Sequence, residues 1–297
     1  MNKKISILMN CYNSEKFIQE SILSVINQTY KNWELIIFDN LSTDNTANIV
    51  NSITDTRIKY IKSSKHYYLG LARYKAEKYL NGEFIGILDS DDIWMPNKLE
   101  KQINDFDDPD VSISYTNTIF FSENNSYILY KNKQPSGYIY NNLLFKYNIS
   151  LETILIRKEH VDTLDCFFDP QFKLISDFDI VLRLSKNFKI KYRNEILAKW
   201  RKHENNTTNK NLINFLIEKE KWASTRILNK NLYNKFIKKN SVDKALLFAI
   251  NEDFNSAKNL LSDNLYFNIK YFFTLYICSI PFMRKILITL YSKRLSV

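Results

Sequence analysis

Short apolar runs separated by amphipathic segments dominate the first third of the chain. The runs are Ile5 to Met9, Trp33 to Phe38, Ile58 to Ile61 and Phe84 to Leu88. Runs that are apolar almost without interruption are typical of parallel strands that helices cover on both faces. After the first run, apolar residues at helical spacing (Ile18, Ile22 and Val25) predict a helix that starts near Ser14. This alternation predicts an α/β fold with a mixed, mainly parallel sheet flanked by helices.

The pattern changes along the rest of the chain. Further strands are predicted at Val111 to Tyr115, Thr118 to Phe121 and Thr153 to Arg157. From Leu212 onward the spacing is helical, and Val242 to Ile250 and Phe254 to Leu261 predict a helical hairpin. We therefore expect an α/β domain over residues 1–209 and a helical C-terminal region over residues 210–297.

The net charge of +10 is concentrated in that C-terminal region. Residues 210–297 hold 15 Lys and Arg against 6 Asp and Glu, whereas the preceding residues are almost neutral. A uniformly basic nucleic-acid binder has a different distribution, and no nucleic-acid-binding module is recognisable, so we expect no nucleic-acid partner. A neutral domain with a basic docking tail fits better.

The thirty residues from Tyr266 to Leu295 interleave aromatic and aliphatic side chains with basic ones. Their longest uncharged run, Tyr271 to Met283, is shorter than the roughly 20 residues that a membrane-spanning helix needs, and Pro281 interrupts it. We expect peripheral contact between this segment and an anionic membrane. The alternative is a helix packed on the α/β domain.

The cysteines and the N-terminus indicate the compartment. Cys11, Cys166 and Cys278 are odd in number and lie far apart, which favours a reducing environment without a disulfide framework. The apolar run after Lys4 is too short for a signal peptide. We expect a cytoplasmic protein, peripheral on the cytoplasmic face of the inner membrane.

Carboxylates gather where the predicted strands end. Asp89, Asp91 and Asp92 directly follow the strand at Phe84 to Leu88, and Asp39 follows the second strand. The carboxyl ends of parallel strands share one edge of the sheet, where ligands of α/β folds bind. Crowded carboxylates repel one another unless a cation lies among them, and Mg²⁺ is commonly held by one or two carboxylates together with substrate phosphates. The alternative is a polar loop that opens the next helix at Pro96.

Four other side chains are candidates with equally plain alternatives. Arg73, in a predicted first helical turn, could bind a phosphate or be solvated. Asp177 and Asp179 lie in another first turn, where the helix dipole favours carboxylates in any case. His203 lies among charged residues, as surface histidines do. Spacing alone does not decide which of these take part in chemistry.

Taken together, these segments resemble glycosyltransferase family 2, the inverting enzymes of the GT-A (Rossmann-like) fold. The matching motifs, in order, are Ile5-Ser6-Ile7-Leu8 with Tyr12-Asn13, Ser24 to Glu34, Asp39 to Thr46, Gly70-Leu71-Ala72-Arg73, Leu88 to Trp94, Phe168 to Phe172, Asp177-Phe178-Asp179 and Trp200 to Asn205. They extend over about two hundred residues. The chain has no Gln-x-x-Arg-Trp motif, so the resemblance is to the non-processive bacterial members.

The resemblance implies roles for the matching residues. Asp39 would bind the nucleotide base, Asp89 the ribose, and Asp91 a Mn²⁺ or Mg²⁺ ion that bridges the diphosphate. The other implied roles are nucleotide-sugar contacts for Tyr12 and Arg73, a general base in Asp177 and a metal ligand in His203. Secondary candidates are Asp92, Asp179 and Trp94. Three positions depart from the family pattern: Asn40 replaces an aspartate, Leu41 a glycine, and Ser176 the acidic residue that often precedes the base.

The resemblance also implies an activity. We expect an inverting transfer of sugar from a nucleotide-diphosphate donor, most commonly a UDP-sugar, to a hydroxyl group of a glycan acceptor in the synthesis of surface polysaccharide or lipopolysaccharide. The basic tail favours a lipid-linked acceptor. The alternative function is that of a catalytically inactive sugar-nucleotide-binding or scaffold subunit in a glycan assembly complex.

Overall fold

The computed structural model describes residues 3–204, 206 and 211–262, with the side chains of 261 and 262 left aside. The chain forms two compact units: residues 1–143 with 148–203, and residues 144–147 with 204–297. The expected interfacial segment at 266–295 lies outside the described residues.

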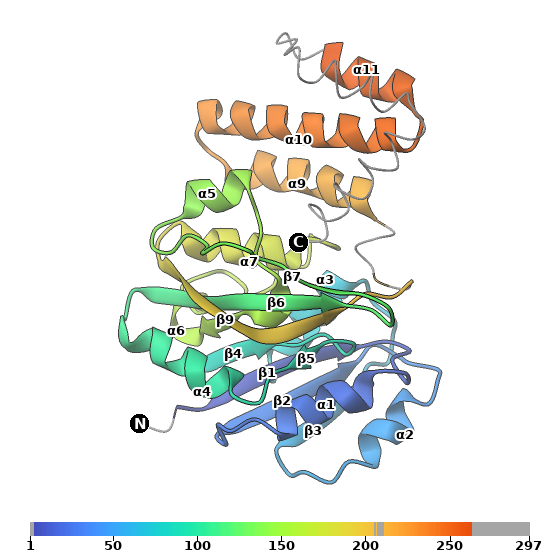
Figure 1. Cartoon of the computed structure of the whole chain (residues 1–297), viewed down its shortest axis with the longest axis vertical. Helices are drawn as coiled ribbons and strands as arrows, with labels where there is room; N and C mark the ends of the chain where they lie inside the picture. The colour runs from blue at the N-terminus through green and yellow to red at the C-terminus, as the bar shows by residue number, and fades with distance from the viewer. Residues whose placement is uncertain (1–2, 205, 207–210, 263–297) are drawn as a thin grey trace. The chain divides into compact units, whose positions relative to one another are not determined.

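The first unit is built on a mixed sheet with the strand order β3-β2-β1-β4-β8-β6-β9-β5, and β7 pairs with the edge of β6 (Figure 1). The strands are β1 (Ile5–Cys11), β2 (Trp33–Asp39), β3 (Ile58–Lys62), β4 (Phe84–Ile87), β5 (Ile93–Trp94), β6 (Val111–Phe121), β7 (Ser126–Ile128), β8 (Leu155–Arg157) and β9 (Lys189–Arg201). β1 to β4 pair in parallel, whereas β8 runs antiparallel to β4. The expected mixed α/β sheet is therefore confirmed.

Helices cover the sheet because each contributes an apolar face. The helices of this unit are α1 (Ile18–Ile26), α2 (Thr46–Asn51), α3 (Leu69–Glu77), α4 (Lys98–Ile103), α6 (Lys158–Val161) and α7 (Ser176–Ser185), with 3-10 turns η1 (Asn104–Asp107) and η2 (Leu151–Thr153); α5 (Tyr140–Phe145) adjoins them. On one face, Ile18, Ile22 and Val25 of α1 pack against alternate residues of β1 and β2. α3 contacts the same two strands from the opposite face (Figure 1).

The sheet differs from the sequence prediction where polar residues interrupt the apolar pattern. The two strands expected at 111–115 and 118–121 are one strand, β6. Asn117, between them, is accommodated because its side chain hydrogen-bonds both the backbone N–H and the backbone carbonyl of Tyr130. β9 was not predicted, since seven of its thirteen residues are charged or amide side chains that mask the strand pattern.

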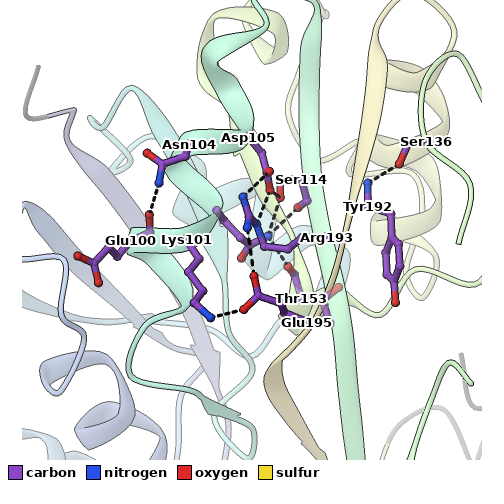
Figure 2. A network of polar contacts seen from close by, with 11 residues as sticks. Glu100, Lys101, Asn104, Asp105, Ser114, Ser136, Thr153, Tyr192, Arg193 and Glu195 are labelled. Carbon is purple, nitrogen blue, oxygen red and sulfur yellow. Dashed lines mark hydrogen bonds and ion pairs between the residues drawn. The ribbon is translucent and has the colours of Figure 1, made fainter. Parts of the chain in front are cut away.

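A polar network fixes the first half of β9 (Figure 2). The Arg193 guanidinium donates to both carboxylate oxygens of Asp105 in η1, at 2.7 and 3.1 Å. Ser114 of β6 donates to the same carboxylate at 2.6 Å, and Glu195 pairs with Arg193 and Lys101. Bidentate Arg–carboxylate pairs constrain geometry as well as adding energy. The network thereby sets the course of β9 towards Arg201 and His203.

The second unit is helical in its described part. It contains α9 (Leu212–Arg226), α10 (Lys230–Ile250) and α11 (Phe254–Ser262). α10 begins where the Asn229 side chain accepts a hydrogen bond from the N–H of Leu232, as a helix cap does. The expected hairpin of α10 and α11 is present, and Ala245, Ala249 and Ala257 form its contact. Among the described residues, no helix is both long and apolar enough to cross a membrane.

Candidate active site

Three loops meet at the carboxyl ends of β1, β2 and β4. The hydroxyl oxygens of Ser14, after β1, and Ser90, after β4, lie 2.8 Å apart. The N–H of Asn13 donates to the Ser42 hydroxyl at 3.0 Å, which joins the first loop to the one after β2. Ser21 of α1 also donates to the carbonyl of Ser90. Parallel strands place their carboxyl ends together, and these hydrogen bonds fix the loops with respect to one another.

Asp39 closes β2 and is completely buried. One carboxylate oxygen accepts the N–H of Ser42 at 2.7 Å and the other accepts the Tyr60 hydroxyl. Burial, followed by this hydrogen bond, raises the pKa of Tyr60 above its ordinary value. The carboxylate of Asp39 thus organises the loop after β2.

An aromatic pair lies beside this loop. Tyr12 is 47% exposed, and its ring lies 4.2 Å from that of His66, centroid to centroid. The Asn40 side chain hydrogen-bonds both backbone groups of Tyr67, and the Asn40 carbonyl contacts Nδ1 of His66 at 3.0 Å. Asn40 therefore holds His66 against Tyr12. Leu41 follows with φ +69°, so the turn keeps a backbone conformation that favours glycine.

Asp89 forms an ion pair with Arg73. Nη2 of Arg73 lies 3.0 Å from Oδ1 of Asp89, and Nη1 lies 2.9 Å from the Ser176 hydroxyl. Burial raises the pKa of Asp89; Arg73 opposes this change, and the negative charges of Asp91 and Asp177 add to it. Arg73 therefore joins the loop after β4 to the first residue of α7, although the two are far apart in sequence.

Asp91 faces His203. Its Oδ2 atom lies 2.8 Å from Nε2 of His203, and both side chains are about one quarter exposed. Arg201 shapes this arrangement, because its guanidinium donates to the Asp91 carbonyl at 2.9 Å and its N–H donates to Asp92 at 2.8 Å. The end of β9 thus places His203 beside the loop that carries Asp91 and Asp92.

Asp92 and Trp94 point inwards. Asp92 is 2% exposed, and burial, followed by the charges of Asp91 and Glu152, raises its pKa well above the ordinary value. The Trp94 indole packs over Gly86 and donates to the carbonyl of Glu152 at 2.7 Å. These two secondary candidates lie in the core beneath the loop.

The two acidic residues at the start of α7 have different surroundings. Asp179 is fully buried and pairs with Arg183 one helical turn later at 2.7 Å, and Arg183 also donates to the carbonyls of Cys166 and Phe167. Asp177 is only partly buried, and it directly follows Ser176, which Arg73 joins to Asp89. Asp179 therefore anchors the loop before α7, and Asp177 is the carboxylate placed near the other acidic residues.

The donor set is compatible with a divalent cation that also binds substrate. Within the part of the chain that the structure describes, no three His, Cys, Asp or Glu side chains converge as a metal site. Asp91 and His203 do converge, at 2.8 Å. A carboxylate oxygen and an imidazole nitrogen are both metal ligands, so Asp91 and His203 would hold such an ion, and substrate phosphates would supply further ligands.

Several residues of this site were missed in the sequence. His66 is a single histidine between Lys65 and Tyr67, and nothing in its spacing indicates a contact with Tyr12. Ser90 lies inside the acidic motif but carries no charge, and its contact with Ser14 depends on two loops meeting. Ser176 is marked only by its departure from the family pattern.

A depression of about 550 Å³ lies elsewhere, at the amino ends of β1 and β4, and residues such as Lys3, Glu83 and Arg157 line it. The guanidinium of Arg157 is engaged with the carbonyls of Phe106, Asp108 and Val111. The depression lies at the opposite edge of the sheet from the carboxylates Asp39, Asp89 and Asp91, so it is distinct from the candidate active site.

Comparison with known proteins identifies the family. Residues 6–163 match the model of "Glycosyl transferase family 2". The chain is 41% identical over 152 residues to the UDP-Glc:alpha-D-GlcNAc-diphosphoundecaprenol beta-1,3-glucosyltransferase WfgD of Escherichia coli, covering 51% of this chain and 59% of WfgD. It is 33% identical over 202 residues to WfaP of the same organism, which has the same activity in its name, covering 67% of this chain and 77% of WfaP.

Solved structures share the fold. TarS 1-349 of S. aureus in complex with UDP-GlcNAc superposes with a TM-score of 0.63 at 18% identity, over 88% of this chain and 80% of that one. The mannosyltransferase PcManGT from Pyrobaculum calidifontis in complex with GDP-Man and Mn²⁺ gives 0.62 at 14% identity, over 88% and 74%. The expected GT-A fold is confirmed. With its family match, the chain belongs to glycosyltransferase family 2.

Proposed function

We propose that this protein is an inverting glycosyltransferase that moves a sugar from a UDP-sugar to a hydroxyl group of a lipid-linked glycan. The observation that carries the proposal is that Arg73 hydrogen-bonds both Asp89 and Ser176, the residue directly before Asp177. This link brings Asp177, a proton acceptor, to the residues that are proposed to hold the sugar donor. The relatives WfgD and WfaP, whose names specify UDP-Glc and GlcNAc-diphosphoundecaprenol, support the donor and acceptor classes.

On the donor side, Asp89 and Asp91 hold the nucleotide and its diphosphate, and Tyr12 contacts the nucleoside. Asp39 orders the loop on which the base rests. Mn²⁺ or Mg²⁺, held by Asp91 and His203, would supply positive charge where the leaving diphosphate becomes more negative. The mutual arrangement of Asp91 and His203, 2.8 Å apart, supports this assignment.

On the acceptor side, Asp177 is the general base. The acceptor hydroxyl oxygen forms a bond to the anomeric carbon while the bond from that carbon to the diphosphate oxygen breaks. The hydroxyl proton passes to the Asp177 carboxylate, and the bonding electron pair leaves with UDP. Attack from the face opposite the leaving group inverts the anomeric centre in a single displacement.

The test combines a panel of UDP-sugars with Mn²⁺ and a GlcNAc-diphospholipid acceptor, and it measures UDP release and product. We expect acceptor-dependent release with at least one UDP-sugar. Asp177→Asn should lower kcat by about 10²- to 10⁴-fold while the dissociation constant of UDP stays within about twofold. Nucleotide binding without transfer by the wild type would favour a scaffold subunit, and normal kcat in Asp177→Asn would refute the assigned base.

We further propose that the protein works at the cytoplasmic face of the inner membrane. The concentration of basic residues after residue 210 and the membrane-linked acceptors named for its relatives support this location. Flotation with vesicles containing anionic lipid should recover the full chain. Replacing Arg284, Lys285, Lys293 and Arg294 by Gln should reduce the recovery, since each basic residue near an anionic surface contributes about 1 kcal/mol. Equal recovery of both proteins would refute the proposal.

A further inference from the structure

Arg73 joins the two acidic segments of the site, the loop after β4 and the start of α7. It lies on α3, is only 2% exposed, and directs one terminal nitrogen to Asp89 and the other to Ser176. Asp89 lies two residues after the end of β4, and Ser176 is the first residue of α7. A single planar guanidinium therefore spans the gap between the segment proposed to hold the donor and the helix that carries the proposed base.

The guanidinium is suited to fixing a distance. Its nitrogens occupy a rigid planar fork, so the positions of two acceptors bound to the two terminal nitrogens are constrained with respect to each other. Burial of Arg73 favours a structural role for its charge, in contrast to an exposed arginine that receives a phosphate from solvent. In this structure the terminal nitrogens of Arg73 contact Asp89 and Ser176, and its expected contact with the nucleotide stays a prediction.

The base of α3 is held firmly against the segment that precedes α7. A Cβ atom at Gly70 would lie 1.9 Å from the Phe172 carbonyl oxygen, so only glycine permits this approach. The Gly70 N–H donates to the Lys173 carbonyl at 3.2 Å, and the Tyr68 hydroxyl donates to the Pro170 carbonyl at 2.6 Å. Arg73 is one helical turn further along α3, so its side chain extends from an anchored frame.

Ser176 completes the link without adding charge. Its hydroxyl accepts from Arg73, and the residue is 1% exposed. An acidic side chain at this position would compete with Asp89 for the arginine. With serine, the carboxylate of Asp89 keeps the ion pair, and α7 is held by a neutral hydrogen bond immediately before Asp177.

We propose that Arg73 and Ser176 are positioning residues that couple the donor-holding carboxylate Asp89 to the orientation of the base Asp177. This inference rests on the proposed function. The link fixes the base with respect to the anomeric carbon, and a displacement of about 1 Å at a reacting centre can cost about 10²-fold in rate. Nucleotide affinity should depend on Ser176 much less, because this residue is 1% exposed and its hydroxyl is engaged with Arg73.

The experiment compares Ser176→Ala with Ser185→Ala. Ser185 is on the same helix and equally buried, but its hydroxyl donates to the Leu182 carbonyl within α7. We expect Ser176→Ala to lower kcat about ten- to hundredfold, with donor KM and UDP dissociation constant within about twofold of wild type. Ser185→Ala should keep normal kcat. Thermal melting of both variants reports any common loss of stability.

Arg73→Lys provides the second arm, because lysine keeps the charge but lacks the fork. We expect a loss of kcat in Arg73→Lys that adding Ser176→Ala does not increase, since both changes break one link. Normal kcat in Ser176→Ala, multiplicative effects in the double variant, or a matching loss of UDP affinity would each overturn the proposal. Absence of transfer by the wild type would instead refute the proposed function on which it rests.

Discussion

Oδ2 of Asp91 and Nε2 of His203 lie 2.8 Å apart, although the residues are 112 positions apart in the sequence. Asp91 belongs to the loop after β4 and His203 follows β9, a strand held in place by Arg193 and Asp105. The pair therefore depends on the whole sheet, from the central parallel strands to β9.

The metal assignment predicts that Asp91→Asn and His203→Ala weaken Mn²⁺-dependent UDP binding. Loss of a residue that only supports a metal ligand costs about 10- to 100-fold in metal affinity, so loss of a ligand should cost at least that much. Isothermal titration of UDP with and without Mn²⁺ measures the effect. Asp162→Asn, an exposed carboxylate paired with Lys158, is the control and should behave as wild type. Unchanged Mn²⁺ dependence in both site variants would exclude these ligands.

The buried ion pair of Asp179 and Arg183 predicts a structural loss. Asp179→Asn removes one partner and leaves the Arg183 charge uncompensated at 8% exposure, which costs about 3–5 kcal/mol. Urea unfolding should show this decrease in the free energy of unfolding. Asp177→Asn, partly exposed in the same helical turn, should cost much less. A similar decrease in the free energy of unfolding for both variants would contradict the structural role assigned to the Asp179–Arg183 ion pair.

Leu41 predicts an unusual response to substitution. Its φ of +69° costs a non-glycine residue about 1–2 kcal/mol, whereas glycine adopts it freely but loses more entropy on folding. Leu41→Gly should therefore leave the free energy of unfolding unchanged or raise it by up to about 1 kcal/mol. Leu41→Val should lower it by more than about 1 kcal/mol, because β-branched residues tolerate this region worst. Urea unfolding of the two variants decides, and a larger loss with glycine than with valine would contradict the backbone argument.

Glu34 predicts acid sensitivity. Burial alone would raise the pKa of Glu34, but hydrogen bonds from Lys4, Ser6 and Lys59 outweigh it and lower the pKa from 4.5 to about 2. A lowered folded-state pKa gives stability that is present above about pH 4.5 and is lost as the pH falls towards 2. The shift corresponds to roughly 3 kcal/mol.

The measurement is the difference in free energy of unfolding between wild type and Glu34→Gln at several pH values. The difference should be constant from pH 7 to pH 5 and shrink below that, since protonation removes the same charge that the variant lacks. A difference that stays constant down to pH 2.5 would show that the carboxylate is not ionised selectively in the folded state.

Local sequence predicted the first half of the sheet well. β1, β2 and β3 occupy the runs that were expected to form them. β1 and β2 are buried along their whole length, which requires residues that are mostly apolar, whereas β3 at the sheet edge is only partly buried and includes exposed lysines. β9 escaped prediction because its polar side chains are satisfied by Asp105, Lys101 and other partners that only folding brings together. Propensity is a weak guide where tertiary hydrogen bonds replace apolar burial.

The sequence by itself determined the family, the parallel strands and the acidic residues at their carboxyl ends, since hydrophobic period and motif order are local properties of the chain. Only the tertiary structure decided which of these side chains meet. It paired Asp91 with His203, buried Asp179 against Arg183, and turned Arg73 inwards between Asp89 and Ser176. These contacts join residues brought close by sheet order and helix packing, and a charged side chain takes its role from the partners that burial leaves within its reach.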